Sequence, residues 1–276
     1  MNLTQHVNKA QETVLEAGKL IKSMRDTGNL ETTLKPDRSP VTNADKKAEK
    51  YVRQALLTAF PKDGFQGEET PEKQTNNNYT WICDPIDGTR SFIGGRDTYS
   101  VSLALTEGEK TVMGIVNNPE RRELYVSAEG QPTTLNGKTL PQKESKPLNK
   151  ATVHYQIASK RKKDTETLQQ LTNQAVIGTL KRQNGSVAYQ LAQVTKEPSN
   201  AYVFARPEYT LNNWDIAAGI HLIRSIGGKV TGLDGKDIEE SEQQNTMLAA
   251  TTPELHQELL ETLVQAQFGK QWLKIA

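Results

Sequence analysis

One stretch, residues 81–89 (Trp-Ile-Cys-Asp-Pro-Ile-Asp-Gly-Thr), constrains this chain more than any other. It begins as a short apolar run, which is typical of a buried β-strand. It ends in Asp-Pro and Asp-Gly, and both pairs favour turns. The stretch therefore predicts a strand whose end carries two carboxylates, Asp84 and Asp87, with the Ile86 carbonyl between them.

The atoms of that turn suit a metal ion and a phosphate. Carboxylate and carbonyl oxygens are the hard ligands that Mg²⁺ takes. The backbone N–H groups of Gly88 and Thr89, just beyond, suit phosphate oxygens. The combination indicates metal-assisted attack of water on a phosphate ester. The simpler alternative, a strand followed by an acidic turn without function, has to be weighed against the acids in the rest of the chain.

Composition places the chain among soluble globular proteins. With 276 residues and 35% hydrophobic content it is long enough for a large core, in one large domain or two intimate halves. The net charge of +1 gives no field that favours nucleic acid or an anionic membrane. There is no signal-peptide core and no apolar run of the roughly 20 residues that span a bilayer. The single cysteine, Cys83, forms no intrachain disulfide. We therefore expect a cytoplasmic protein that binds neither nucleic acid nor membrane.

Periodicity predicts the elements of the first half. Apolar residues spaced by three and four between Val7 and Met24 predict a long helix that Gly28 ends. Residues 99–105, 111–116 and 123–126 favour strands, and Asn136-Gly137 predicts a hairpin. We place the end of this half near Leu148. The expected domains are therefore an α+β part, 1–148, which carries most metal ligands, and an α/β part, 149–276, which completes the site.

The second half alternates strands and helices. Strands are expected at 153–157, 176–180, 201–205, around 230 and at 247–250, and helices at 164–175, 185–194, from 214 and from 253. Thr252 is the expected cap of the last helix. The basic run 160–163 favours a solvated turn, because four basic residues on a near-neutral chain are weak grounds for nucleic acid.

Acids elsewhere fall where the chain is expected to turn. Asp45 lies in the first turn of a helix that Thr42 or Asn43 caps, and Asp215 heads a helix directly after Trp214. Each also has a plain structural explanation, compensation of the helix dipole. Glu68, after a short strand-like piece, belongs either to a solvated loop or to a metal cluster. The presence of all these acids together favours a shared site.

Two motifs carry a resemblance to a known family. Residues 84–89 (DPIDGT), preceded by 67–69 (GEE) and followed by 214–219 (WDIAAG), resemble the inositol monophosphatase superfamily of Mg²⁺-dependent, lithium-sensitive phosphatases. The resemblance extends from about Ser39 to Gly235. It implies an α/β fold, a layered αβαβα sandwich of the sugar-phosphatase type.

The resemblance also implies which residues bind two or three Mg²⁺ ions. Glu68, Asp84 and the Ile86 carbonyl would hold the first ion. Asp84, Asp87 and Asp215 would hold the second, and Glu68 would share a third, weaker ion.

Catalytic and phosphate-binding roles follow from the same resemblance. Thr89, paired with Asp45, would orient a metal-activated water and accept its proton. The N–H groups of Gly88 and Thr89 would hold the phosphate during in-line displacement. Glu68, Asp45 and Thr89 are thus the expected catalytic residues, with Asp87 and Asp215 also facing the substrate.

The substrate is less constrained. Glu208 stands seven residues before Asp215, where an acid binds a ring hydroxyl in inositol phosphatases, and Ser186 matches another position of the substrate pocket. myo-Inositol monophosphate is therefore our first choice. However, Arg90 and residues 39–42 (SPVT) look closer to histidinol-phosphate phosphatases and to 3′(2′),5′-bisphosphate nucleotidases. Residues 212–213 (NN) also differ from the pattern of the inositol enzymes.

Functions of other classes remain as rivals. One is a metal-binding interaction module without turnover, although every expected ligand position carries an acid. A nucleotide-dependent phosphotransferase is disfavoured because the sequence contains neither a Gly-x-x-x-x-Gly-Lys-Ser/Thr loop nor Gly-x-Gly-x-x-Gly. A homodimer through the first helix is a further hypothesis.

Overall fold

The computed structural model describes residues 3–140, 144–158, 160–206, 208–238 and 243–269. They form two compact units. The first unit contains the described residues within 1–139, 185–189 and 213–222, and the second contains those within 140–184, 190–212 and 223–276. The first unit therefore contains every predicted site residue except Glu208. The domain boundary near Leu148 stays a prediction.

A seven-stranded sheet forms the centre of the first unit, in the order β3-β4-β5-β6-β7-β8-β9. Strands β3 and β4 are parallel, and the later neighbours are antiparallel. The strands span Gly64–Gly67 (β3), Tyr79–Asp87 (β4), Ser100–Glu107 (β5), Lys110–Asn118 (β6), Glu123–Ala128 (β7), Thr134–Leu135 (β8) and Lys138–Thr139 (β9). The predicted hairpin is confirmed: Asn136 and Gly137 have φ angles of 51° and 75°, as a two-residue type I′ turn requires.

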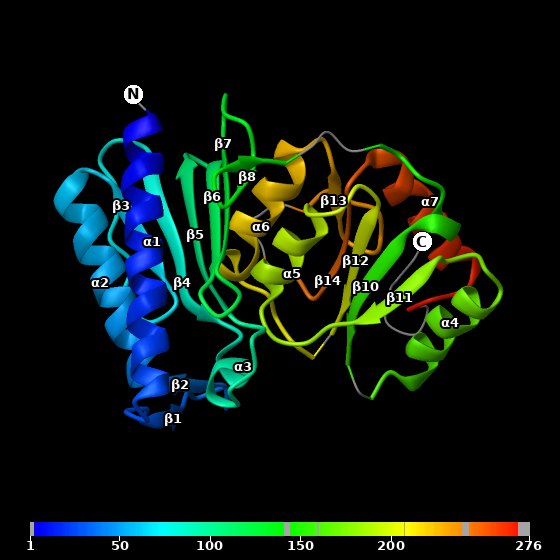
Figure 1. Cartoon of the computed structure of the whole chain (residues 1–276), viewed down its shortest axis with the longest axis horizontal. Coiled ribbons are helices and arrows are strands. Elements are labelled where there is room, and N and C mark those ends of the chain that lie inside the picture. Colours follow the sequence, from blue (N-terminus) through cyan, green and yellow to red (C-terminus); the bar gives the residue numbers. More distant parts are fainter. Residues whose placement is uncertain (1–2, 141–143, 159, 207, 239–242, 270–276) are drawn as a thin grey trace. The chain divides into compact units, whose positions relative to one another are not determined.

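Helices α1 (Leu3–Asp26) and α2 (Asn43–Ala59) pack against each other and against one face of this sheet (Figure 1). Side chains alternate between the faces of a strand, so Val101, Leu103 and Leu105 of β5 all point into the core beneath the two helices. The predicted first helix is thus confirmed, and its apolar stripe is buried within its own unit.

The other face of the sheet carries the first part of α6 (Asn213–Ser225). The helix approaches so closely that a Cβ at Gly114 would lie 2.5 Å from the Ala218 carbonyl oxygen. His221, which we expected to be structural, lies with its Nδ1 2.7 Å from Ser127 Oγ and is buried. The short elements β1 (Thr32–Leu34), β2 (Pro40–Thr42) and α3 (Thr89–Ile93) complete the unit, and α5 (Val187–Val194) begins in it.

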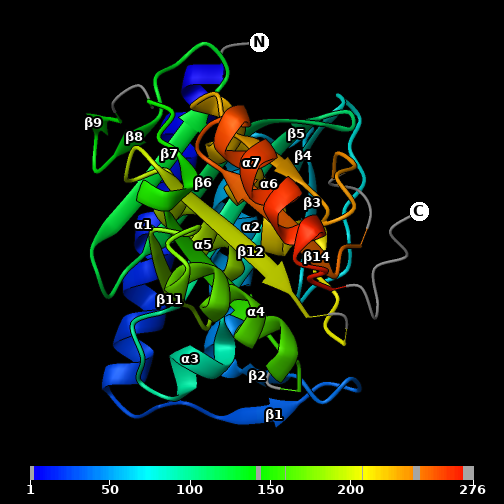
Figure 2. The ribbon, with the colours of Figure 1, turned by 90° about the vertical axis from the view of Figure 1, so that its right-hand side faces the viewer.

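The second unit is built on a five-stranded sheet in the order β11-β10-β12-β14-β13. Its elements are η1 (Leu148–Lys150), β10 (Thr152–Ile157), α4 (Lys162–Asn173), β11 (Thr179–Arg182), β12 (Asn200–Ala205), β13 (Lys229–Thr231), β14 (Thr246–Ala250) and α7 (Pro253–Gln265). Strand β10 is parallel to both neighbours, whereas β14 is antiparallel to both. Leucines of α4 and α7 share one core with this sheet. Figure 2 shows the ribbons of both helices. Thr252 caps α7 as predicted.

One predicted strand, 176–180, is placed wrongly. Strand β11 begins only at Thr179 because the chain first turns after α4. Ala175 has a φ of 56°, and a Cβ at Gly178 would lie 2.7 Å from the Asn149 carbonyl oxygen. Neither the turn nor this close approach has a signal in the apolar pattern. None of the helices in the described part of the chain has the length and apolar content of a membrane span.

Candidate functional site

Strand β4 ends in an irregular turn that carries the acids of the key stretch. The register with β5 shifts between Asp84 and Asp87, which marks a β-bulge. The Ile86 N–H donates to Asp84 Oδ1 at 2.9 Å. Gly88 follows with a φ of 86°, and a Cβ there would lie 2.7 Å from the Ser186 nitrogen. Only glycine fits this position, because it combines a left-handed backbone with a close approach.

Three aspartates from distant parts of the chain meet at this turn. Asp84, Asp87 and Asp215 each offer one carboxylate oxygen, and these oxygens lie within 4.8 Å of one another. The three residues are buried, with exposed fractions of 2%, 5% and 6%. Asp215 comes from the first turn of α6. An all-oxygen donor set of this kind fits a divalent cation such as Mg²⁺.

The electrostatics of the three aspartates also fit a cation. Burial raises the pKa of Asp84 well above its ordinary value, and the charges of Glu68, Asp87 and Asp215 raise it further. Burial likewise raises the pKa of Asp87 to about 6. Like charges held together out of water disfavour ionisation. A bound cation would remove that cost.

Asp87 is held in place by the start of α5. Its Oδ2 accepts hydrogen bonds from Ser186 Oγ at 2.6 Å and from the Ala188 N–H at 2.8 Å. Ser186 is fully buried and lies 2.8 Å from Ser100 Oγ. These contacts show that Ser186 supports Asp87, and its predicted contact with the substrate stays a prediction.

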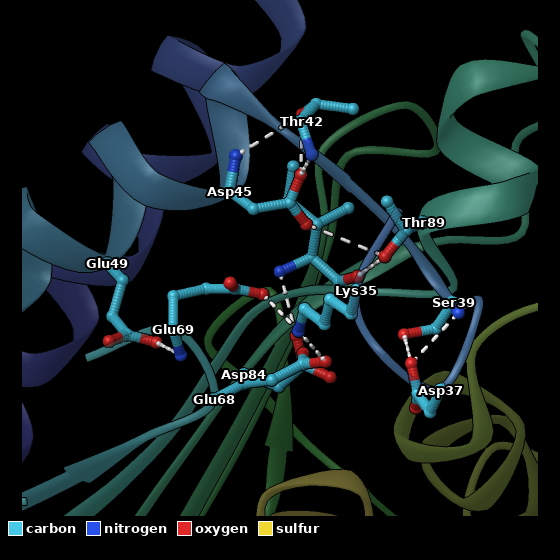
Figure 3. Close-up of polar contacts among 11 residues, drawn as sticks. Lys35, Asp37, Ser39, Thr42, Asp45, Glu49, Glu68, Glu69, Asp84 and Thr89 are labelled. Atoms are coloured by element: carbon cyan, nitrogen blue, oxygen red, sulfur yellow. Dashed lines mark hydrogen bonds and ion pairs between the residues drawn. The ribbon is translucent and has the colours of Figure 1, made fainter. Parts of the chain in front are cut away.

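The place of Asp45 is compatible with both of the roles that the sequence left open, and its catalytic role stays a prediction. Thr42 caps α2 with a capping box, and its N–H donates to Asp45 Oδ2 at 2.8 Å. The other carboxylate oxygen, Oδ1, lies 3.5 Å from Thr89 Oγ1, which is also 3.1 Å from the Ile86 carbonyl oxygen (Figure 3). Burial raises the pKa of Asp45 to about 6, against the effect of its hydrogen bonds with Thr42.

Glu68 has a different partner from the three aspartates. Lys35 Nζ lies 2.6 Å from Glu68 Oε1 and 2.6 Å from Glu69 Oε1 (Figure 3). Burial opposes the charge on Lys35, but the two glutamates outweigh it and raise the pKa of Lys35. Glu68 lies near enough to raise the pKa of Asp84 by its charge. It therefore stands at the edge of the acidic group, with a lysine as its counter-ion.

Glu208 belongs to the second unit. Its side chain is 50% exposed, and Oε1 lies 3.9 Å from Arg206 Nε. Its predicted contact with a substrate hydroxyl therefore stays a prediction that rests on its spacing from Asp215.

Sequence reasoning missed two residues of this region, Lys35 and Glu49. Nothing in the sequence around Lys35 indicates that it reaches Glu68. Glu49 did have a signal, because it lies four residues after Asp45 on the buried side of α2. That spacing places both acids on one face of the helix.

The chain matches the model of the family described as "Inositol monophosphatase family" over residues 2–267. It is 34% identical to the inositol-1-monophosphatase of Rhizobium meliloti (strain 1021) over 236 residues, 83% of this chain and 86% of that protein. It is 40% identical to the histidinol-phosphatase of Chlorobaculum parvum over 135 residues, 49% of this chain and 52% of that protein. The solved inositol monophosphatase from Anabaena (Nostoc) sp. PCC 7120 has the same fold, with a TM-score of 0.78, 24% identity and coverage of 99% and 100% of the two chains.

These similarities confirm the predicted α/β fold class and the predicted family resemblance. The chain therefore belongs to the inositol monophosphatase family and is a phosphoric monoester hydrolase of that family.

Proposed function

We propose that this protein hydrolyses a small phosphate monoester with the help of two or three Mg²⁺ ions. The observation that carries the proposal is the set of three buried aspartates, Asp84, Asp87 and Asp215, whose oxygens lie within 4.8 Å of one another. Glu68 and the Ile86 carbonyl complete the proposed ligands. Bound cations would lower the pKa of a coordinated water and offset the charge of the phosphate.

The chain's own residues then have distinct tasks. Asp45 and Thr89 orient the attacking water, and Asp45 takes its proton, because Asp45 Oδ1 faces Thr89 Oγ1 at 3.5 Å. A raised pKa of about 6 suits a base that works near neutral pH. Backbone N–H groups of Gly88 and Thr89, where β4 gives way to α3, bind the phosphate oxygens.

myo-Inositol monophosphate is the first substrate to test, and the relative from Rhizobium meliloti supports it. In this proposal Glu208 accepts a hydrogen bond from a ring hydroxyl. The experiment is phosphate release from a panel of small monoesters, measured with and without Mg²⁺. We expect release from myo-inositol 1-phosphate only when Mg²⁺ is present. If inositol phosphate is untouched while another monoester is cleaved, the substrate proposal fails and the reaction class stands.

A second candidate substrate is histidinol phosphate. The partial match to a histidinol-phosphatase supports it, as does the exposed Arg90 directly after the phosphate-binding turn. The panel therefore includes histidinol phosphate and 3′-phosphoadenosine 5′-phosphate. Activity on one of these alone would replace inositol phosphate as the proposed substrate.

A further inference from the structure

Glu49 is a buried carboxylate that the proposed reaction does not use. It lies on α2, one turn beyond Asp45, with an exposed fraction of 0%. Among the described residues it forms no ion pair within 4.0 Å. Burying a carboxylate without a counter-ion costs folding free energy. The contacts of Glu49 therefore indicate which role offsets that cost.

The Glu49 carboxylate holds the backbone next to Glu68. Its Oε2 accepts the Glu69 N–H at 2.8 Å (Figure 3). On the other side, the Glu68 N–H donates to the Cys83 carbonyl oxygen of β4 at 3.2 Å. The two amides that flank the Glu68 side chain are thus fixed by different elements, one by α2 and the other by β4.

Gly67 shows how closely this carboxylate fits. A Cβ on Gly67 would lie 2.3 Å from the Glu49 carboxyl carbon and 2.4 and 2.5 Å from its two oxygens. Because real Cβ atoms essentially never lie so close to another atom, a side chain at position 67 would have to displace the Glu49 carboxylate. The carboxylate therefore packs directly on the backbone that leads into Glu68.

Arg53 continues the same side of α2 one turn later. Its Nη1 donates to Thr70 Oγ1 at 2.9 Å and to the Pro71 carbonyl oxygen at 2.7 Å. Residues four apart lie on one face of a helix, so Asp45, Glu49 and Arg53 form a polar stripe. This stripe contacts, in order, Thr89, Glu69 and the segment 70–71.

From these contacts we infer that Glu49 is a positioning residue for the cation site. It fixes the turn at residues 67–69 and so places the Glu68 carboxylate beside Asp84. This inference rests on the proposed function, because it assumes that Glu68 helps to hold a cation. Residues that orient metal ligands without touching the metal typically change its affinity by about ten- to a hundredfold when they are removed.

The test measures cation binding directly, with Mn²⁺ as a paramagnetic substitute for Mg²⁺. Metal-stripped wild type, Glu49→Ala, Glu49→Gln and Lys50→Ala are titrated with Mn²⁺ and followed by electron paramagnetic resonance. Lys50 is the control, because it is exposed on the same helix. We expect Glu49→Ala to weaken Mn²⁺ binding about ten- to a hundredfold. Glu49→Gln should retain most of the affinity, since its amide oxygen still accepts the Glu69 N–H, and Lys50→Ala should match wild type.

The outcomes separate this inference from the proposed function. Equal Mn²⁺ affinity in folded Glu49→Ala and wild type would overturn the role of Glu49 and leave the proposed function intact. A wild type that binds no Mn²⁺ would instead remove the proposed function. A steady-state readout adds to this: the Mg²⁺ requirement of Glu49→Ala should rise while the KM for substrate at saturating Mg²⁺ stays near wild type.

A second pair of variants covers the case in which Glu49→Ala does not fold. Gly67→Ala places a methyl group against the Glu49 carboxylate and should weaken Mn²⁺ binding. Combining it with Glu49→Asp, which shortens the side chain, should recover part of that loss. Recovery would show that the contact between residue 67 and the Glu49 carboxylate controls Mn²⁺ binding. Mn²⁺ binding equal to wild type in Gly67→Ala would contradict that role.

Discussion

At the scale of single residues, three acids of the site, Asp84, Asp87 and Asp45, each have one carboxylate oxygen fixed by a backbone N–H group. Asp84 accepts the Ile86 N–H, Asp87 accepts the Ala188 N–H, and Asp45 accepts the Thr42 N–H. Hydrogen bonds of this kind to a carboxylate are stronger than those between neutral groups. They fix the side chains in advance, so a cation or a water meets oxygens that are already in position.

Asp84 is the residue whose change should matter most. Asp84→Asn keeps the shape of the side chain but removes a charge from the buried group. Because a metal contributes several kcal/mol to the transition state, we expect phosphate release to fall by about 10³-fold or more, on the order of 4 kcal/mol. The fold should persist. Asp97→Asn is the matched control, since Asp97 pairs with Arg121 at the surface. A wild-type rate in Asp84→Asn would exclude the proposed metal site.

The raised pKa values of Asp45 and Asp87, both about 6, predict how stability depends on pH. Their pKa in the unfolded chain is about 3.9. Without metal, their stabilising effect is therefore complete below about pH 4 and is lost as the pH rises through about 6. Mg²⁺ binds the carboxylates in their ionised form, so the stability that Mg²⁺ adds increases as the pH rises.

We therefore expect the rise in Tm on adding Mg²⁺ to be small at pH 5 and larger at pH 7. Buried His154 and His256 have pKa values lowered to about 4. Their contribution to stability is lost as the pH falls, which is the opposite of the effect of Asp45 and Asp87. Comparing samples with and without Mg²⁺ at each pH cancels their effect. The measurement is thermal unfolding of metal-stripped protein. A rise in Tm that is the same at both pH values would contradict the assignment.

At the scale of elements, α2 combines a structural task with the chemical task that we propose for Asp45. Its capping box both starts the helix and fixes Asp45 opposite Thr89. A helix that began one residue later would carry Asp45 away from that position. The site therefore depends on where α2 begins as well as on the acids themselves.

Thr42→Ala tests that dependence. It removes the side chain that accepts the Ala44 and Asp45 N–H groups. Loss of such a cap costs about 1 kcal/mol, so the midpoint of urea unfolding should fall and activity should fall with it. Thr42→Ser keeps the hydroxyl and should behave like wild type in both assays. Unchanged stability in Thr42→Ala would show that the cap does not fix the start of the helix.

Elements with a strong local pattern were predictable from the sequence. The apolar run before Asp84 predicted β4, and the spacing from Val7 to Met24 predicted α1. By contrast, the ion pair of Lys35 with Glu68 joins a hairpin to a strand end 33 residues away, and no local signal encodes it. The start of β11 was missed for a related reason, because a left-handed residue and a close backbone approach fix it rather than periodicity.

At the scale of the whole molecule, the acids of the first unit come from segments far apart in the sequence. Residues 185–189 and 213–222 join residues 1–139 in that unit, and they supply the supports of Asp87 and the Asp215 carboxylate. The predicted homodimer remains a hypothesis for light scattering. The apolar stripe of α1 is already buried in its own unit, so a dimer would have to use other residues.

Lithium is a further test of the molecule as an enzyme of its family. We expect Li⁺ to inhibit phosphate release and the inhibition to depend on the Mg²⁺ concentration, because both ions would compete for the same carboxylates. The measurement is the rate at several Li⁺ and Mg²⁺ concentrations, with K⁺ at equal ionic strength as the control. Full activity at high Li⁺ would count against the weaker, third ion at Glu68.

The most direct measurement is a Mg²⁺ titration of metal-stripped protein, followed by phosphate release from myo-inositol 1-phosphate. If the buried aspartates hold the ions that drive hydrolysis, release should be absent without Mg²⁺ and should rise to saturation as Mg²⁺ is added. An equal rate with and without Mg²⁺ would contradict that claim.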